Sequence, residues 1–206
     1  MAYKTSEKMA DRKQARRRRF LDTAIALFGR LGYHGATVPM IVGEAQTSTG
    51  AFYLYFRNKE DVYAAALAEI GARLSAALGR AIAQESRRDA QMSAAVEGLV
   101  EWLAGNPSEA RMLMEAATLG GRLEEVRRTI IESHVRSVAA ELEFAAPGVD
   151  AGDRALVARC WVGAVLEAAM GWLRMPPEER PEAAHLGTIV ARFNLRGAGI
   201  AAGREI

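Results

Sequence analysis

The chain has 206 residues, of which 50% are hydrophobic and 25% are charged. This length suits a small domain followed by a larger core, and the composition excludes a chain that is disordered throughout. The start, Met1 to Lys4, lacks the apolar core of a signal peptide, and the longest apolar run, 160–166, is far shorter than the roughly 20 residues of a membrane-spanning helix. A single cysteine, Cys160, excludes an intramolecular disulfide and fits a reducing cytoplasm.

Charge is distributed unevenly along the chain. Residues 1–59 hold 11 Lys and Arg against 4 Asp and Glu, a net charge of +7, whereas the remaining 147 residues hold 16 against 21, a net charge of −5. A basic head on an acidic body is typical of a protein that binds a polyanion. A solvated basic tail has the same composition, so charge alone leaves both interpretations open.

The spacing of apolar residues predicts an all-α protein of about nine helices, because they recur every three or four positions and no stretch alternates for long with period two. We expect a first helix over about 11–31, ended by Gly32 as a left-handed cap. Thr37 is expected to cap a short second helix. Residues 49–56 would form the third helix, and Asn58 would cap the fourth.

The predicted third helix has two different sides. Phe52 and Phe56, four residues apart, are expected to anchor it to the first two helices. The other side presents hydroxyl groups, aromatic rings and a glycine, from Thr47, Thr49, Gly50, Tyr53, Leu54 and Tyr55. A small three-helix core with an aromatic face is the alternative, but this face coincides with a tight turn and with the run Arg16–Arg19. That combination favours docking on DNA.

Residues 37–62 resemble the helix-turn-helix signature of TetR-family transcriptional regulators. In that signature a threonine opens the second helix, and a Gly-small-apolar-Tyr-x-Tyr-Phe-x-x-Lys string forms the third helix and enters the fourth. The corresponding positions here are Thr37 and Gly50-Ala51-Phe52-Tyr53-Leu54-Tyr55-Phe56-Arg57-Asn58-Lys59, and the similarity is specific over about residues 14–65.

Two positions depart from the family pattern. Gln46 stands where the family commonly has glycine, so the turn is expected to differ slightly in shape. Leu54 stands where the family often has a polar residue, which favours apolar contact with a thymine methyl group over hydrogen-bonded base readout.

These observations predict two domains. The resemblance implies a helix-turn-helix DNA-binding domain with a basic N-terminal arm over 1–60, and a helical ligand-binding and dimerisation domain over 61–206. We expect the arm to attract DNA without regard to sequence and the third helix to choose bases. The residues expected to contact DNA are Arg17, Arg18, Thr37, Thr47, Ser48, Thr49, Gly50, Tyr53, Leu54, Tyr55 and Lys59.

Beyond residue 65 only the architecture resembles the family. Breaks at glycine and proline divide the rest of the chain into further long helices. Ser108 is expected to cap one of them, and Pro181 to start the last. The helices are expected over about 61–84, 90–104, 109–119, a stretch ending near 146, a stretch from 150 or 153 to 174, and a stretch from 181 onward.

The last two helices carry a candidate dimer surface. Small residues at i, i+4 and i+7 would permit close approach of a second helix, and in the resembling family these two helices pair with their copies. Completion of the monomer core is the alternative for both helices. The interface residues expected are Trp161, Ala164, Ala168, Gly171, Leu186, Ile189, Val190 and Phe193.

Polarizable and aromatic side chains in the second half suit an apolar ligand. The candidate ligand-binding residues are Trp102, Met112, Glu115, His134, Trp161, Glu167 and Met170. Core packing is the alternative for the Met and Trp residues, and a hydrogen-bonded histidine is the alternative for His134. The residues themselves indicate no effector class.

Other classes of protein are disfavoured. The chain shows no nucleophile–base pairing, no phosphate-binding glycine loop and no metal-ligand spacing, so neither an enzyme, a cofactor nor a metal is predicted. A helical adaptor that binds a membrane or an acidic protein through the basic arm is the alternative, but it needs an exposed apolar face on the first helix. We predict a cytoplasmic, ligand-responsive repressor that binds a near-palindromic operator as a homodimer and is released by a small apolar effector, with no membrane partner.

Overall fold

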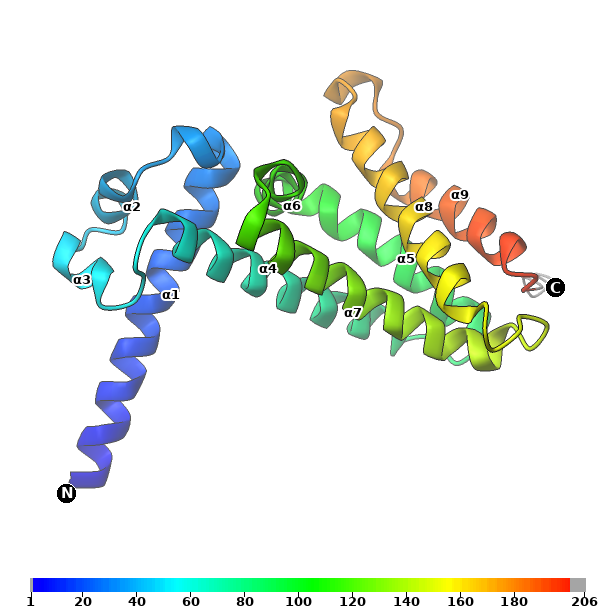
Figure 1. The fold of residues 1–206 in the computed structure, drawn as a ribbon, viewed down its shortest axis with the longest axis horizontal. Helices are drawn as coiled ribbons and strands as arrows, with labels where there is room; N and C mark the ends of the chain where they lie inside the picture. Colours follow the sequence, from blue (N-terminus) through cyan, green and yellow to red (C-terminus); the bar gives the residue numbers. More distant parts are fainter. Residues whose placement is uncertain (1, 201–206) are drawn as a thin grey trace. The chain divides into compact units, whose positions relative to one another are not determined.

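A computed structural model describes residues 2–200, with the side chains of Met9 and of residues 11–200. Within this range the chain forms nine α-helices, one short 3₁₀ helix and no strand, which confirms the predicted all-α fold. The helices are labelled in Figure 1. They are α1 (Ala2–Gly35), α2 (Val38–Glu44), α3 (Thr49–Tyr53), α4 (Lys59–Ile82), α5 (Arg88–Gly105), α6 (Pro107–Leu119), α7 (Gly121–Ala145), α8 (Arg154–Arg174) and α9 (Ala183–Gly197), with the 3₁₀ helix at Pro177–Glu179.

The helices pack as two compact units. Unit 1 comprises Met1–Ile70 and Pro107–Arg127, and unit 2 comprises Gly71–Asn106 and Arg128–Ile206. Unit 1 therefore contains α6 together with the first three helices, although the segment Gly71–Asn106 of unit 2 precedes α6 in the chain. The functional division predicted between residues 60 and 61 remains a prediction.

 Packing between helices, and not order along the chain, decides which unit a helix joins, so α6 belongs with α1.

The caps of unit 1 form where the sequence predicts them. Gly32 interrupts α1 with φ 74° and ψ 172°, a backbone conformation that glycine adopts without strain. The Thr37 hydroxyl oxygen accepts a hydrogen bond from the backbone N–H of Met40 at 3.4 Å, at the start of α2. The Asn58 side chain accepts one from the backbone N–H of Asp61 at 2.8 Å, at the start of α4. These bonds satisfy amide groups that the first turn of a helix leaves unpaired.

Several helix boundaries differ from the prediction, and four of the differences have a local explanation. α1 begins at Ala2, because nothing between residues 2 and 11 breaks a helix. α3 ends at Tyr53, where the chain tightens into a turn with the Tyr55 amide bonded to the Phe52 carbonyl. α6 begins with a proline at its first position, so Ser108 lies inside the helix instead of capping it. α9 begins at Ala183, two residues after Pro181. The Pro181 carbonyl oxygen lies outside the helix and accepts a hydrogen bond from the Trp172 indole at 2.8 Å.

Aromatic rings hold the first three helices together. Phe20 of α1 meets Phe52 of α3 edge to face with 5.5 Å between ring centroids, and meets Phe56 at 6.3 Å. All three side chains are buried, as are Ile41 and Val42 of α2. Edge-to-face pairs add to the stabilisation that burial of the rings already provides. This packing confirms that Phe52 and Phe56 anchor α3.

Unit 2 is built around close contact of α5 with α9 and of both with α8. A Cβ atom added to Gly187 would lie 3.0 Å from the Glu97 Cα atom, so this glycine allows α9 to approach the α5 backbone. The buried Asn194 side chain donates a hydrogen bond to the Trp161 carbonyl at 3.2 Å, which joins α9 to α8. A buried amide needs such a partner.

Two helices within residues 2–200, α4 and α8, are long and apolar enough to cross a membrane on length and composition alone. Core helices of globular proteins meet the same criterion. Both helices bury apolar residues inside the fold, including Leu67 and Ile70 of α4 and Trp161 and Val165 of α8.

Candidate nucleic-acid interface

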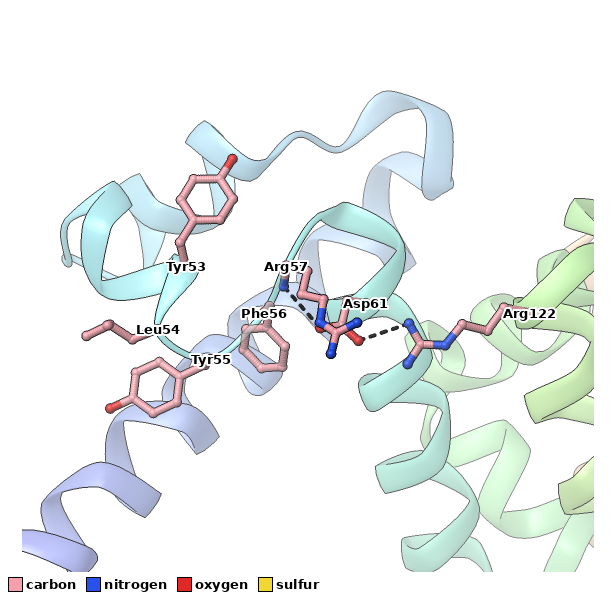
Figure 2. Close-up of a pocket in the computed structure, with 7 residues that line it drawn as sticks. All are labelled: Tyr53, Leu54, Tyr55, Phe56, Arg57, Asp61 and Arg122. Atoms are coloured by element: carbon pink, nitrogen blue, oxygen red, sulfur yellow. Dashed lines mark hydrogen bonds and ion pairs between the residues drawn. The ribbon is translucent and has the colours of Figure 1, made fainter.

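The short helix α3 is held on one side and open on the other. Phe52 is buried, whereas Tyr53 is 56% exposed and Leu54 is 75% exposed. Figure 2 shows Tyr53, Leu54 and Tyr55 extending outward from the end of α3. Tyr53 and Leu54 are therefore both accessible to a partner on the open side of α3.

The other predicted contacts of the helix-turn-helix lie around this face. Ser48 caps α3, because its hydroxyl oxygen accepts a hydrogen bond from the Ala51 amide at 3.2 Å. Thr49 and Gly50 are exposed, and no atom lies within 4 Å of the position that a Gly50 Cβ would take. Thr47 and Tyr55 are half-buried. The structure thus brings together the residues predicted from Thr47 to Tyr55.

The turn between α2 and α3 places Gln46 in a left-handed conformation, with φ 51°. The Gln46 amide donates a hydrogen bond to the Gly43 carbonyl at 3.0 Å, and the Thr47 amide donates one to the Val42 carbonyl at 3.1 Å. For a residue with a Cβ atom this conformation is less favourable by about 1–2 kcal/mol, whereas glycine adopts it freely. Gln46 therefore holds the backbone shape that a glycine would favour at this position.

A surface hollow of about 490 Å³ lies beside α3, lined by Tyr53, Leu54, Tyr55, Phe56, Arg57, Asp61 and Arg122. Figure 2 shows Asp61 between Arg57 and Arg122. Asp61 accepts a hydrogen bond from the Arg57 amide at 3.0 Å and pairs with the Arg122 guanidinium at 3.0 Å. The hydrogen bond from the Arg57 amide, followed by that from Arg122, holds the pKa of Asp61 below its ordinary value.

Sequence reasoning missed Arg57 and Arg122 at this hollow. Arg57 is exposed, and its position directly after the aromatic string was the available signal. Arg122 lies 61 positions after Asp61 in the chain, and no local pattern connects the two residues.

The four consecutive arginines of α1 have different surroundings. The Arg17 guanidinium lies 5.7 Å from the centroid of the Phe56 ring. Arg18 bonds both carboxylate oxygens of Asp22 at 3.1 and 3.2 Å, and bonds Glu69 of α4 at 2.8 Å. A second hollow, of about 420 Å³, is lined instead by Arg16 and Arg19 together with Ala15, Gln46, Thr47, Ser48 and Ala51.

Lys59 lies at the end of α1 as well as at the start of α4. Its ammonium group donates hydrogen bonds to the carbonyl oxygens of Tyr33 at 2.8 Å and Ala36 at 3.2 Å, and lies 4.4 Å from the Tyr33 ring centroid. A cation is favoured beside carbonyl groups at the end of a helix. Lys59 thus joins α1 to α4, and its predicted contact with DNA stays a prediction.

Helix α6 is fastened to the end of α1 by two side chains one turn apart. The Arg111 guanidinium donates to the carbonyl oxygens of Gly29 at 3.1 Å and Arg30 at 3.2 Å. Both carboxylate oxygens of Glu115 accept the Tyr33 amide, at 2.8 and 2.9 Å. Arg111 and Glu115 therefore satisfy backbone groups on either side of the break at Gly32.

A tyrosine of α4 completes the attachment of α6. The buried Tyr63 hydroxyl donates to the Met112 carbonyl at 3.0 Å and lies 3.3 Å from the Glu115 carboxylate. Burial, reinforced by Glu115, raises the pKa of Tyr63, so this hydroxyl remains a neutral donor. These contacts fix α6 within unit 1.

The seven predicted ligand-binding residues do not gather at one place. Met112 and Glu115 lie in unit 1, where Met112 is fully buried and Glu115 accepts the bonds described above. Glu167 of α8 points to solvent, with its side chain 80% exposed. The remaining four belong to unit 2: Trp102, His134, Trp161 and Met170.

His134 of α7 has an unusual environment. Its Nε2 atom is buried and has no hydrogen-bond partner among the described residues. Burial lowers the pKa of His134, so the ring is neutral at pH 7 and has one N–H to donate. Among residues 2–200, no group of three or more His, Cys, Asp and Glu side chains is arranged to hold a metal ion.

The predicted dimer residues are partly interior and partly exposed. Trp161 and Val190 are each 5% exposed and pack inside unit 2, so they offer little surface to a second copy. Ile189 is 52% exposed and Phe193 is 67% exposed on α9. Ala164, Ala168, Gly171 and Leu186 are of intermediate exposure.

Comparison with known proteins identifies the N-terminal part of the chain. Residues 20–66 match the family model for bacterial regulatory proteins of the tetR family. The fatty acid metabolism regulator protein of Bacillus subtilis (strain 168) is 36% identical over 50 residues, which are 24% of this chain and 26% of that protein. The HTH-type transcriptional regulator HbdR of Aromatoleum sp. (strain CIB) is 39% identical over 49 residues, 24% of this chain and 21% of that protein. The match thus spans about a quarter of each relative's length.

Solved structures resemble the fold over most of the chain. The transcriptional regulator FadR from Bacillus subtilis, solved in complex with stearoyl-CoA, superposes with a TM-score of 0.75 at 20% identity and covers 87% of this chain and 97% of that chain. A bacterial regulatory protein in the tetR family from Rhodococcus RHA1 has a TM-score of 0.71 at 22% identity, covering 91% and 98%. Residues 20–66 thus match the TetR family of bacterial regulatory proteins, and the fold of the chain is similar to that of solved transcriptional regulators.

Proposed function

We propose that this protein is a dimeric, ligand-responsive regulator of transcription that represses its targets by binding near-palindromic DNA. The observation that carries the proposal is the outward face of α3, where Tyr53 and Leu54 are exposed on a helix whose other side is anchored by buried Phe52. A helix held in this way can enter the major groove of DNA. The Tyr53 hydroxyl would donate to a phosphate, and Leu54 would contact a thymine methyl group.

Two copies are needed for tight and specific binding, because one small reader makes few contacts with DNA. The exposed apolar side chains of α9, Ile189 and Phe193, support association through α8 and α9. A two-fold axis would place two α3 helices in successive major grooves about 34–36 Å apart, so the DNA site should be nearly palindromic.

The structure disfavours the adaptor alternative. Lipid binding through the basic arm needs an apolar face on α1, yet Phe20, Leu27 and Phe28 are all fully buried. The exposed stretch 11–19 is almost entirely charged or polar. Between residues 11 and 28, the arm and α1 therefore offer charge to a polyanion and bury these three apolar side chains.

The Tyr53→Phe variant should bind its preferred DNA about tenfold more weakly, because it loses one hydrogen bond to a charged phosphate, worth about 1.5 kcal/mol. Fluorescence anisotropy with labelled DNA measures the change. Tyr33→Phe is the matched control, since it removes a tyrosine hydroxyl from the far end of α1 and should leave affinity unchanged. Equal affinity of the Tyr53→Phe variant and the wild type would show that the Tyr53 hydroxyl does not contact DNA.

The effector is proposed to be an apolar molecule with a hydrogen-bond acceptor, bound in unit 2 near His134. The buried, unpartnered Nε2 atom of this neutral histidine supports the proposal, because it donates to such an acceptor in the tautomer that carries the proton on Nε2. Acyl-CoA thioesters are the first class to test, because they combine an apolar chain with a carbonyl group and because one structural relative was solved with stearoyl-CoA.

Long-chain acyl-CoA should raise the thermal midpoint of the protein and release it from DNA. A ligand at 100 times its dissociation constant stabilises a protein by about 2.7 kcal/mol. Free CoA, which lacks the chain, should do neither, and His134→Ala should weaken the response to acyl-CoA while DNA binding persists. If acyl-CoA changes neither the midpoint nor the DNA affinity, this effector class is wrong.

A further inference from the structure

Four consecutive arginines on a helix cannot all face the same partner, because successive side chains point about 100° apart. Arg16 and Arg19, three positions apart, share a side of α1 and both line the second hollow. Arg17 and Arg18 point elsewhere and contact other parts of unit 1. The run therefore consists of two pairs in different environments.

Arg17 and Arg18 both contact other side chains of the same protein. Arg17 lies over the ring of Phe56, the residue that anchors the end of α3. Arg18 is shared between Asp22 of its own helix and Glu69 of α4. Binding to a phosphate would require Arg18 to give up two carboxylates, so both residues are better suited to holding α1 in place.

The pair Arg16 and Arg19 has no such partner. Neither side chain forms a hydrogen bond or ion pair with the residues that the structure describes, and both are exposed. The second hollow has no Asp or Glu among its lining residues, so the two positive charges there are not neutralised. The rest of its wall comes from the turn and the first residues of α3, including Thr47 and Ser48.

We propose that this hollow binds one or two phosphates of the DNA backbone, through the guanidinium groups of Arg16 and Arg19. Guanidinium groups match the geometry of phosphate oxygens and remain charged at any physiological pH. A phosphate held against the turn would fix the position of α3 in the adjacent groove without reading sequence. This inference rests on the proposed function, and it assigns the arm's contacts with DNA to Arg16 and Arg19 in place of Arg17 and Arg18.

Two double variants test the assignment, because each removes two positive charges from the same run. Arg16→Ala with Arg19→Ala should weaken binding to preferred and to random DNA by similar factors. It should also lower the slope of log affinity against log salt by about 0.9 for one phosphate or about 1.8 for two. Its thermal midpoint should match that of the wild type. Arg17→Ala with Arg18→Ala should keep most of the salt slope and unfold at a lower temperature.

The outcomes separate this inference from the proposed function. If both double variants lose the same slope, the arginines act only as a diffuse charge and the phosphate site is wrong. A larger loss of slope in the Arg17 and Arg18 pair would also overturn it. If the wild-type protein shows no preference among DNA sequences, the proposed function itself fails. If the wild type prefers a sequence but the two double variants lose the same salt slope, only the phosphate site is refuted. The variant Arg16→Lys with Arg19→Lys, which keeps the charges, should retain most of the slope.

Discussion

The Gly29→Ala variant is expected to unfold at a lower temperature than the wild type and to lose DNA affinity. A Cβ atom on Gly29 would lie 2.2 Å from the Ser108 Cβ and 2.6 Å from the Ser108 Cα, so the backbone of α6 would have to move. Overpacking typically costs about 1–3 kcal/mol, and a clash with backbone belongs at the upper end. Each kcal/mol lowers the midpoint of a chain of this size by about 2–4 °C. Differential scanning calorimetry measures the shift.

Gly79→Ala on α4 is the matched control for this change. No atom lies within 4 Å of the position that a Gly79 Cβ would take, so alanine there should stabilise the helix by about 0.5–1 kcal/mol. The two variants should therefore shift the midpoint in opposite directions. Ser108→Gly should restore part of the stability of Gly29→Ala, because it removes the nearest atoms but leaves the Ser108 Cα. A stabilised Gly29→Ala variant would show that α1 and α6 do not meet at Gly29.

The Gly171→Leu variant is expected to dissociate into monomers and to lose DNA affinity in parallel. A Cβ on Gly171 meets no atom within 4 Å inside the protomer, so leucine at this position should leave the fold intact. If α8 lies at the two-fold contact, the added side chain is felt twice and costs about 2–6 kcal/mol in total. The dimer dissociation constant should rise by about 30-fold to 10⁴-fold. Sedimentation equilibrium measures it, with circular dichroism as the check on helix content.

Gly79→Leu provides the control for leucine on an exposed helix. A Cβ at this position also meets no atom within 4 Å, and Gly79 lies on α4, outside the two helices proposed to form the interface. This variant should remain as dimeric as the wild type. A Gly171→Leu protein that stays fully dimeric would place the interface on another surface and would contradict the proposed role of α8.

The helix-turn-helix could be predicted because its signals are local. Gly32, Thr37 and Asn58 act through backbone groups a few residues away, and each does in the structure what its residue type predicts. The anchoring of α3 by Phe52 and Phe56 follows from their spacing of four. Spacing and capping decide such features almost without reference to the rest of the chain.

The roles of individual charges could not be predicted, because their partners are distant in sequence. Arg18 pairs with Glu69, and Lys59 bonds the carbonyl oxygens at the end of α1. Glu115, a candidate ligand contact in the sequence, accepts the Tyr33 amide 82 positions away. Residue type shows that these groups need partners, but only packing shows which ones they have.

Selection of DNA from a random pool by the purified protein tests the central claim most directly. Sequencing the bound DNA should reveal a near-palindrome whose half-sites lie about one helical turn, 34–36 Å, or a multiple of it, apart. A variant with Tyr53→Phe and Leu54→Ala should enrich this sequence less, because it lacks two contacts of the α3 face. If the wild-type protein enriches no sequence, or enriches one without two-fold symmetry, it is not the dimeric DNA reader proposed here.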